Sequence, residues 1–103
     1  MKPTNNNGYG LTSFSDTPWG PLIVASAWSA PRYASPVRGG GSAIEVHTCG
    51  VYAAGSSEHI ATVQLEVGSP LSDAVVWDHS EGGVKYLAPS WLVALLPPAP
   101  TVA

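Results

Sequence analysis

The chain has 103 residues, of which 45% are hydrophobic and 11% are charged, and its formal net charge is −3 at pH 7. About a quarter of the residues in a typical soluble domain are charged, so we expect this chain to work in contact with other protein. The four cationic residues form no cluster, which argues against direct binding of DNA or RNA. No apolar run approaches the roughly 20 residues of a membrane-spanning helix, so we expect no membrane partner.

Residues 1–20 are predicted to form an extended N-terminal arm. The asparagine run at 5–7 and the glycine, serine, threonine and proline residues after it favour turns and show no sustained periodicity. Tyr9, Phe14 and Trp19 interrupt this polar sequence. Aromatic side chains bury a large area when they dock, on the chain's own core or on a neighbour. We predict these three as partner-binding residues and expect deletion of residues 1–20 to leave the body folded but unable to attach.

Residues 21–96 are predicted to form a mainly β domain, a small β-sandwich or barrel of five to six strands. The short apolar run at 21–28 is long enough for one buried strand. It is followed by a long loop at 29–42, which contains two prolines and Gly39-Gly40-Gly41 and has no predicted element of its own. The sequence after these glycines favours a strand, whereas a phosphate-binding loop needs a helix with a lysine there.

Residues 43–67 contain the clearest unit, a β-hairpin in which apolar and polar residues alternate on both sides of the turn at 54–57. With Gly55 and Ser56 at the centre of a two-residue turn, Val46 lies opposite Leu65 on the core face. The same register places Glu45 opposite Glu66, an unfavourable pair of like charges. Either the register is shifted or these carboxylates are solvated at the strand ends.

A second hairpin is predicted from the apolar runs 74–77 and 84–88, which flank a polar turn. Pro89 ends it. Residues 91–96 then form a last strand or a single helical turn, and residues 97–103 form a proline-rich tail.

The candidate catalytic and metal-binding residues are few. His47 and Cys49 share one face of a strand and suit two zinc ligands, but parity places His59 on the opposite face from Thr62 and Gln64, the expected neighbours of that pair. Cys49 also lacks the helix N-terminus that would activate a thiol. We therefore expect Cys49 to be buried, His47 to lie at the surface, and the protein to be no enzyme and to bind no metal ion or cofactor.

The charges are unevenly distributed along the chain. Residues 1–38 carry Lys2, Arg32 and Arg38 against one acidic residue, a net charge of +2, whereas residues 39–103 carry one lysine against six acidic residues, a net charge of −5. A cationic arm beside an acidic body favours assembly of the arm on a neighbour. On this basis Arg32 and Arg38 join the predicted partner-binding residues, although so few charges also scatter unevenly by chance.

One local motif resembles a known family. Val75-Val76-Trp77-Asp78 and the polar, glycine-containing turn after it are similar to a strand-turn segment of lambda-type capsid decoration (cement) proteins of tailed bacteriophages. The length, the low charge, the N-terminal arm and the β-rich body fit the same family, whereas the chain has no recognisable helix of the kind that family often carries. The resemblance implies a homo-oligomer, a trimer on capsid symmetry axes, whose arm adds a strand to the major capsid protein.

Two hypotheses follow from the sequence. The first is a non-enzymatic structural protein of a large assembly, a virion decoration protein assembled in the host cytoplasm, with neck, tail and fibre-associated roles as variants. The second is a small β-sandwich binding module for carbohydrate or peptide. The four tryptophans bear on the second hypothesis, because they either fill the core or form a stacking platform for a ligand.

Overall fold

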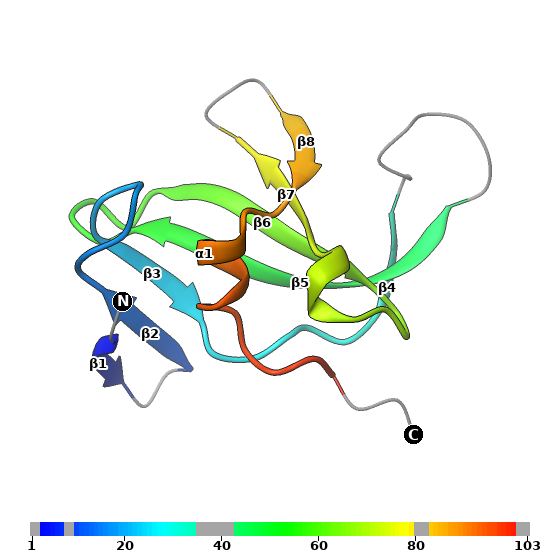
Figure 1. The fold of residues 1–103 in the computed structure, drawn as a ribbon, viewed down its shortest axis with the longest axis horizontal. Coiled ribbons are helices and arrows are strands. Elements are labelled where there is room, and N and C mark those ends of the chain that lie inside the picture. The colour runs from blue at the N-terminus through cyan, green and yellow to red at the C-terminus, as the bar shows by residue number, and fades with distance from the viewer. Residues whose placement is uncertain (1–2, 8–9, 35–42, 80–82, 101–103) are drawn as a thin grey trace.

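The computed structural model describes residues 3–7, 10–34, 43–79 and 83–100, with the backbone alone for 3–7. This part of the chain folds into one antiparallel β-sheet with two short helical turns (Figure 1), so the prediction of a mainly β fold is confirmed. The strands are β1 (Pro3–Asn7), β2 (Leu11–Phe14), β3 (Leu22–Ala25), β4 (Arg32–Ala34), β5 (Ile44–Ala53), β6 (His59–Glu66), β7 (Val75–Asp78) and β8 (Val84–Leu87). The helical turns are η1 (Leu71–Asp73), a 3₁₀-helix, and α1 (Ser90–Val93).

Seven strands follow one another across the sheet in the order β1-β2-β3-β5-β6-β7-β8, and the short β4 pairs with β5 beside this path. Strands β3 and β4 share one edge of β5, because β3 pairs with residues 51–53 and β4 with residues 44–46. Ser29 fills the gap between them: its backbone N–H donates to the Thr48 carbonyl, and its hydroxyl accepts from the Thr48 N–H, both at 2.9 Å. The predicted loop 29–42 therefore contains a strand.

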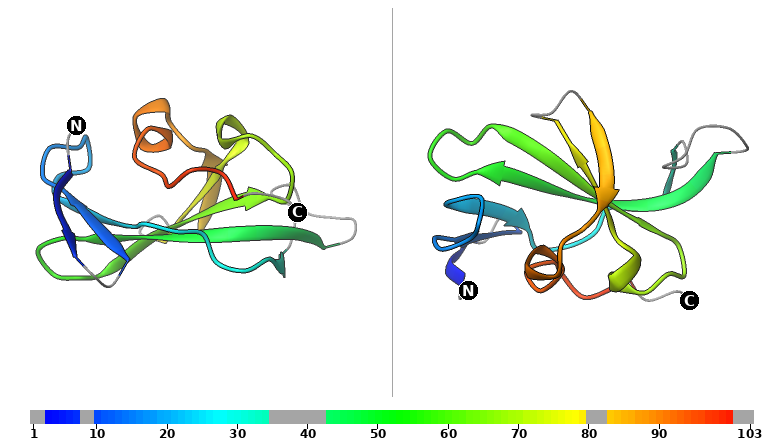
Figure 2. Two further views of the ribbon diagram at one scale, coloured as in Figure 1. Left: turned by 90° about the horizontal axis from the view of Figure 1, so that it is seen from below. Right: turned by 45° about the horizontal axis from the view of Figure 1, so that its top comes forward.

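The hydrophobic core lies on one face of the sheet. We call this the inner face, because α1, η1 and the segment after α1 lie over it, and the opposite one the outer face (Figure 2). The described strands form a single curved sheet, and the helical turns cover its inner face. Residues 91–96 supply the cover, with Leu92 fully buried and Leu95 and Leu96 almost so. Pro89 starts α1 as its N-cap, where its missing N–H costs no hydrogen bond.

The register of the β5–β6 hairpin differs from the predicted one by one residue. Val46 lies opposite Glu66, and Cys49 lies opposite Val63. The connection is longer than a two-residue turn: the N–H of Ala53 donates to the carbonyl of Glu58 over 2.8 Å. A shift of one residue exchanges the two faces of a strand. The predicted core face of β5 is therefore wrong: Cys49 faces the core, and Val46 belongs to the outer face.

The same shift relieves the charge conflict in the predicted hairpin. Glu45 lies beside Val67, whose N–H donates to the Glu45 carbonyl over 3.0 Å, whereas Glu66 faces Val46 across the strands. Neighbouring positions in a strand point to opposite faces. The two carboxylates are thus on different faces of the sheet.

The N-terminal region is part of the sheet. Strand β1 pairs with β2, and β2 pairs with β3 from Leu11 opposite Ala25 to Phe14 opposite Leu22. Phe14 is 6% exposed and packs in the core. Residues 1–20 are therefore not an arm outside the domain in the part that the structure describes, and deletion of 1–20 would remove a core side chain together with a central pairing partner of β3.

Candidate interaction face

The five predicted partner-binding residues do not form one surface. Tyr9 and Arg38 lie outside the described residues. Phe14 is buried in the chain's own core, and Trp19 is 36% exposed and meets the ring of Trp91 edge-on, with 5.0 Å between ring centroids. Arg32 is exposed on β4, opposite Val46. Of the five, Arg32 is therefore the residue that the structure places on the outer face.

The pair His47 and Cys49 is buried on the inner face. Burial raises the pKa of the Cys49 thiol to about 12, and the thiol donates a weak hydrogen bond to the Ala25 carbonyl at 3.4 Å. The Nδ1–H of His47 donates to the Ser29 carbonyl over 2.8 Å. The expectation for Cys49 is confirmed, and the prediction of a surface position for His47 is wrong. No group of three or more metal-ligating side chains occurs within the described ranges.

Four rings form a continuous cluster on the outer face, which we call the aromatic row: Tyr52, His59, His79 and Trp77. Successive ring centroids along the row are 4.9, 4.8 and 4.6 Å apart. The hydroxyl of Thr62 lies 3.1 Å from Nε2 of His59 and 2.9 Å from Nε2 of His79. A hydroxyl carries one proton, so at neutral imidazoles it donates to one ring and accepts from the other.

The aromatic row was not predictable from the sequence, because it depends on a β-bulge in β6. Ala61 lies opposite Val51, but His59 lies opposite Tyr52, so Ile60 is an extra residue in β6. The bulge reverses the parity of the residues before it. His59 therefore shares a face with Thr62, and the prediction that the two lie on opposite faces is wrong. Ile60 is not marked by glycine or proline, so no local signal indicated the bulge.

A surface depression lies beside the aromatic row, and we call it the Trp77 groove. Its volume is about 410 Å³, and it crosses the outer face from β4 to β7. Polar side chains of β5 and β6 line it between Arg32 and Tyr33 on one side and Trp77 on the other. Gly50 keeps the floor low, because a Cβ atom at this position would lie 2.6 Å from the Tyr52 hydroxyl.

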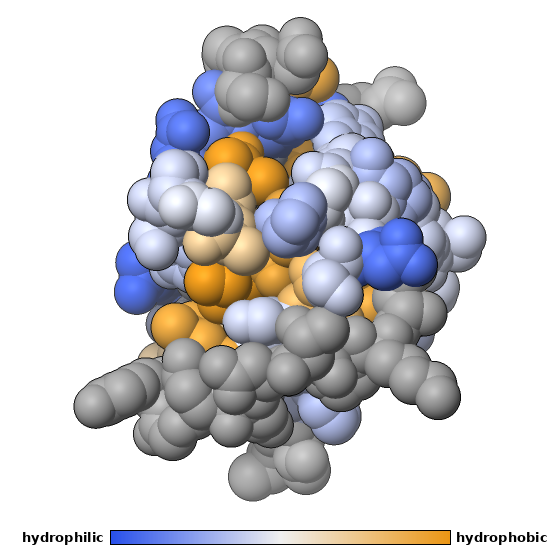
Figure 3. All heavy atoms as spheres, turned by 90° about the vertical axis from the view of Figure 1, so that its left-hand side faces the viewer, coloured by the Kyte–Doolittle hydropathy of each residue, from blue (hydrophilic) through white to orange (hydrophobic). Residues whose placement is uncertain are grey.

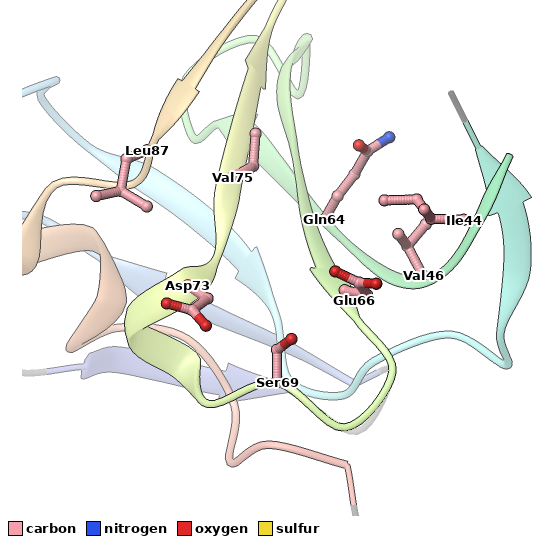
Figure 4. A pocket seen from close by; sticks show the side chains of 8 residues that line it. All are labelled: Ile44, Val46, Gln64, Glu66, Ser69, Asp73, Val75 and Leu87. Atoms are coloured by element: carbon pink, nitrogen blue, oxygen red, sulfur yellow. The ribbon is translucent and has the colours of Figure 1, made fainter. Parts of the chain in front are cut away.

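A second depression, which we call the Val75 hollow, adjoins the groove at Gln64 and has a volume of about 320 Å³. Figure 4 shows its apolar side chains coming from three strands, with polar groups at the end near η1. Its lining consists of Ile44, Val46, Gln64, Glu66, Ser69, Asp73, Val75 and Leu87. The lining is thus apolar with a carboxylate rim, which is the composition of a protein-contact surface with a polar edge.

Strand β8 forms one edge of the sheet in the described part of the chain. Two of its four residues are exposed and apolar: Val84 is 51% exposed and Leu87 is 64% exposed. Exposed edge strands usually carry charged residues or proline, which prevent the addition of another strand. Strand β8 contains one charged residue, Lys85, and no proline. Seen from the side of the β1–β2 hairpin, a further band of apolar surface runs between hydrophilic patches (Figure 3).

Comparisons with models of protein families, with curated proteins and with solved structures found no match. In the ranges that the structure describes, neither helical turn has the length or the apolar character to cross a lipid bilayer.

Proposed function

We propose that the chain is a non-enzymatic structural protein of a large assembly, a virion decoration (cement) protein that binds a repeating protein surface and stabilises it. The observation that carries the proposal is the exposure of Leu87 on edge strand β8, at the rim of the Val75 hollow. A leucine side chain gains about 1.5–3 kcal/mol when it is fully buried. An edge strand that presents such a side chain is suited to pairing with a partner strand.

The composition supports the same function. With 11% charged residues, the chain has little charge to keep its surface hydrated, and three of its five large exposed hydrophobic residues in the described ranges lie on β7 and β8: Trp77, Val84 and Leu87. The rim of the Val75 hollow carries Glu66 and Asp73, which favours a partner segment with basic residues beside an apolar one. A protein that binds the intact particle but not its separated subunits shifts the equilibrium toward the intact particle by mass action.

The proposal includes a homo-oligomer, a trimer in its simplest form, and a location in the virion. Strand β7 spans the four residues Val75–Asp78 on which the resemblance to decoration proteins depends, and β7 pairs with edge strand β8. A partner on β8 would therefore extend the sheet next to the motif. Since residues 3–7 and 11–14 already belong to the sheet, attachment through β8 replaces attachment through a free N-terminal arm.

The experiment is reattachment to particles. Particles carrying the chain are stripped of it by mild denaturant, and purified protein is added back and counted per particle by quantitative gel analysis. The wild-type chain should rebind at a fixed stoichiometry, whereas Leu87→Glu should lose rebinding while its circular dichroism is unchanged. Ala99→Glu, which places the same charge at another exposed position, should rebind as the wild type does.

Two outcomes would contradict the proposal. One is full rebinding of Leu87→Glu, which would exclude the β8 edge. The other is a chain that sediments as a monomer and is absent from every particle fraction of its source. Either result leaves the fold untouched and removes the assembly function.

A further inference from the structure

We propose that the Trp77 groove is a saccharide-binding site, selective for a sugar that carries a carboxylate. The proposal goes beyond the assembly function, because it concerns a different part of the outer face and a different class of ligand. Saccharides are recognised by aromatic rings that cover their apolar C–H faces and by side chains that bond their hydroxyl groups. The groove brings both kinds of group together, and its volume of about 410 Å³ lies in the range of small-molecule sites.

The rings beside the groove are held in place before any ligand arrives. The ammonium group of Lys85 lies 5.5 Å from the centroid of the Trp77 ring, and His79 contacts the same ring from the aromatic row. Tyr52 is supported by His59 and lies over Gly50. Rings fixed in this way lose little conformational freedom on binding, so their contact with a sugar is not offset by a large entropic cost.

The floor and the far wall of the groove supply hydrogen bonds. Gln64 carries both donors and acceptors, and the Thr48 hydroxyl is oriented by a 2.9 Å hydrogen bond with the Ser29 hydroxyl. Tyr33, 75% exposed on β4, adds a further hydroxyl and ring on the wall opposite Trp77. A ligand with several hydroxyl groups matches this mixture of donors and acceptors.

The charge of the lining selects among sugars. The chain has seven acidic and four basic residues, yet the described lining of the groove contains Arg32 and no carboxylate. A guanidinium group binds a carboxylate through two parallel hydrogen bonds. An acidic oligosaccharide, with one sugar ring on Trp77 and the carboxylate of another sugar unit on Arg32, therefore suits the groove better than a neutral one.

The position of the groove disfavours a peptide ligand. It lies over β5 and β6, and both of these strands are paired on both sides along most of their length. Their backbone groups are not available for the strand addition by which extended peptides commonly bind. Recognition here depends on side chains alone, which suits a compact, hydroxyl-rich ligand.

The test is calorimetric titration of the full chain with two tetrasaccharides, one of hyaluronan, which carries uronic acid carboxylates, and chitotetraose, which is neutral. The hyaluronan fragment should bind at least about tenfold more tightly. Arg32→Gln should remove that preference, and Trp77→Ala should weaken binding of the hyaluronan fragment about tenfold. The matched control is Trp19→Ala, a tryptophan with the same 36% exposure outside the groove, which should bind as the wild type does.

Gly50→Ala provides a second variant that does not depend on the stability of Trp77→Ala. Its Cβ would clash with the Tyr52 ring and displace it from its present position in the groove lining, so binding should weaken while circular dichroism stays unchanged. The proposal is overturned if neither sugar binds at millimolar concentration, if the neutral sugar binds as well as the acidic one, or if Trp77→Ala and Gly50→Ala both bind normally. Competition by a proline-rich peptide for the same site would also overturn it. None of these results affects reattachment through Leu87, so the two proposals fail separately.

Discussion

The indole N–H of Trp28 donates a hydrogen bond of 3.2 Å to the carbonyl oxygen of Pro97, which is 69 residues later in the sequence. Trp28 follows β3 and Pro97 follows α1, so this bond connects the middle of the chain to the start of the proline-rich tail. Pro97 is buried, and its carbonyl would lose a partner if the indole N–H were removed. An unmatched buried acceptor costs more than an average hydrogen bond contributes.

Trp28→Phe is therefore expected to lower the free energy of unfolding by about 1–2 kcal/mol. The measurement is urea denaturation followed by far-UV circular dichroism. Trp19→Phe is the matched control: it keeps an aromatic ring near Trp91, and the Trp19 indole forms no hydrogen bond in the described part of the chain. Equal losses in the two variants would show that the Trp28–Pro97 bond contributes nothing specific.

Cys49 gives a prediction for alkaline pH. The pKa of the thiol is about 12 in the folded chain, against an ordinary value of 9.0, because burial disfavours the thiolate. Between these two values the folded chain keeps a proton that the unfolded chain has lost. The contribution to stability is therefore complete below pH 9 and is lost as the pH rises toward 12, at up to about 1.4 kcal/mol per pH unit.

The measurement is the free energy of unfolding between pH 7 and 11, compared in the wild type and Cys49→Ala. Lysine and tyrosine titrate in the same range, so the difference between the two slopes isolates the thiol. The wild type should lose stability more steeply than Cys49→Ala above pH 9. In the folded wild type at pH 8, a thiol reagent should also react far more slowly than in urea, and parallel slopes together with fast labelling would contradict the burial of Cys49.

The sequence was sufficient to locate the strands of the central region. Strands β5, β6 and β8 fall inside the runs that alternation and glycine- or proline-rich turns had marked, and β7 extends one residue beyond its run, to Asp78. The helical turn that was one of two expectations for residues 91–96 is α1, which begins one residue earlier, at Ser90. The N-terminal strands were not recognised, because β1 has the sequence Pro-Thr-Asn-Asn-Asn, and asparagine has a low propensity for strands. Pairing with β2 decides its conformation.

The candidate site could not be predicted, because it depends on register. Strand β5 has apolar residues at both parities, Val46 on one face and Cys49 and Val51 on the other, so alternation alone did not identify the inner face. The extra residue Ile60 then brought His59 to the face of Thr62. The register of a hairpin is determined by its turn and its bulges. These features depend on how the strands pack in the folded chain, and the local sequence indicates them only weakly.

Trp19 and Trp91 are expected to be energetically coupled. Their rings meet edge-on at an interplanar angle of 84°, an arrangement favoured by the aromatic quadrupole. A double-mutant cycle with Trp19→Ala and Trp91→Ala should give a coupling energy of about 0.5–1.5 kcal/mol in urea denaturation. A parallel cycle with Trp19→Ala and Trp77→Ala, whose rings make no contact, should be additive. Additivity in both cycles would exclude the edge contact in solution.

Gly68 is expected to be required by the turn after β6. Its φ is +87°, in the left-handed region, where a Cβ atom is strained even though no atom lies within 4 Å of the position it would occupy. Gly68→Ala should therefore lower the free energy of unfolding by about 1 kcal/mol.

Gly55 is the matched control, because it also has open space around it but no positive φ, so Gly55→Ala should change stability little or raise it slightly. Chemical denaturation of the two variants side by side tests this. A loss in Gly55→Ala as large as that in Gly68→Ala would indicate that space rather than backbone conformation limits both positions.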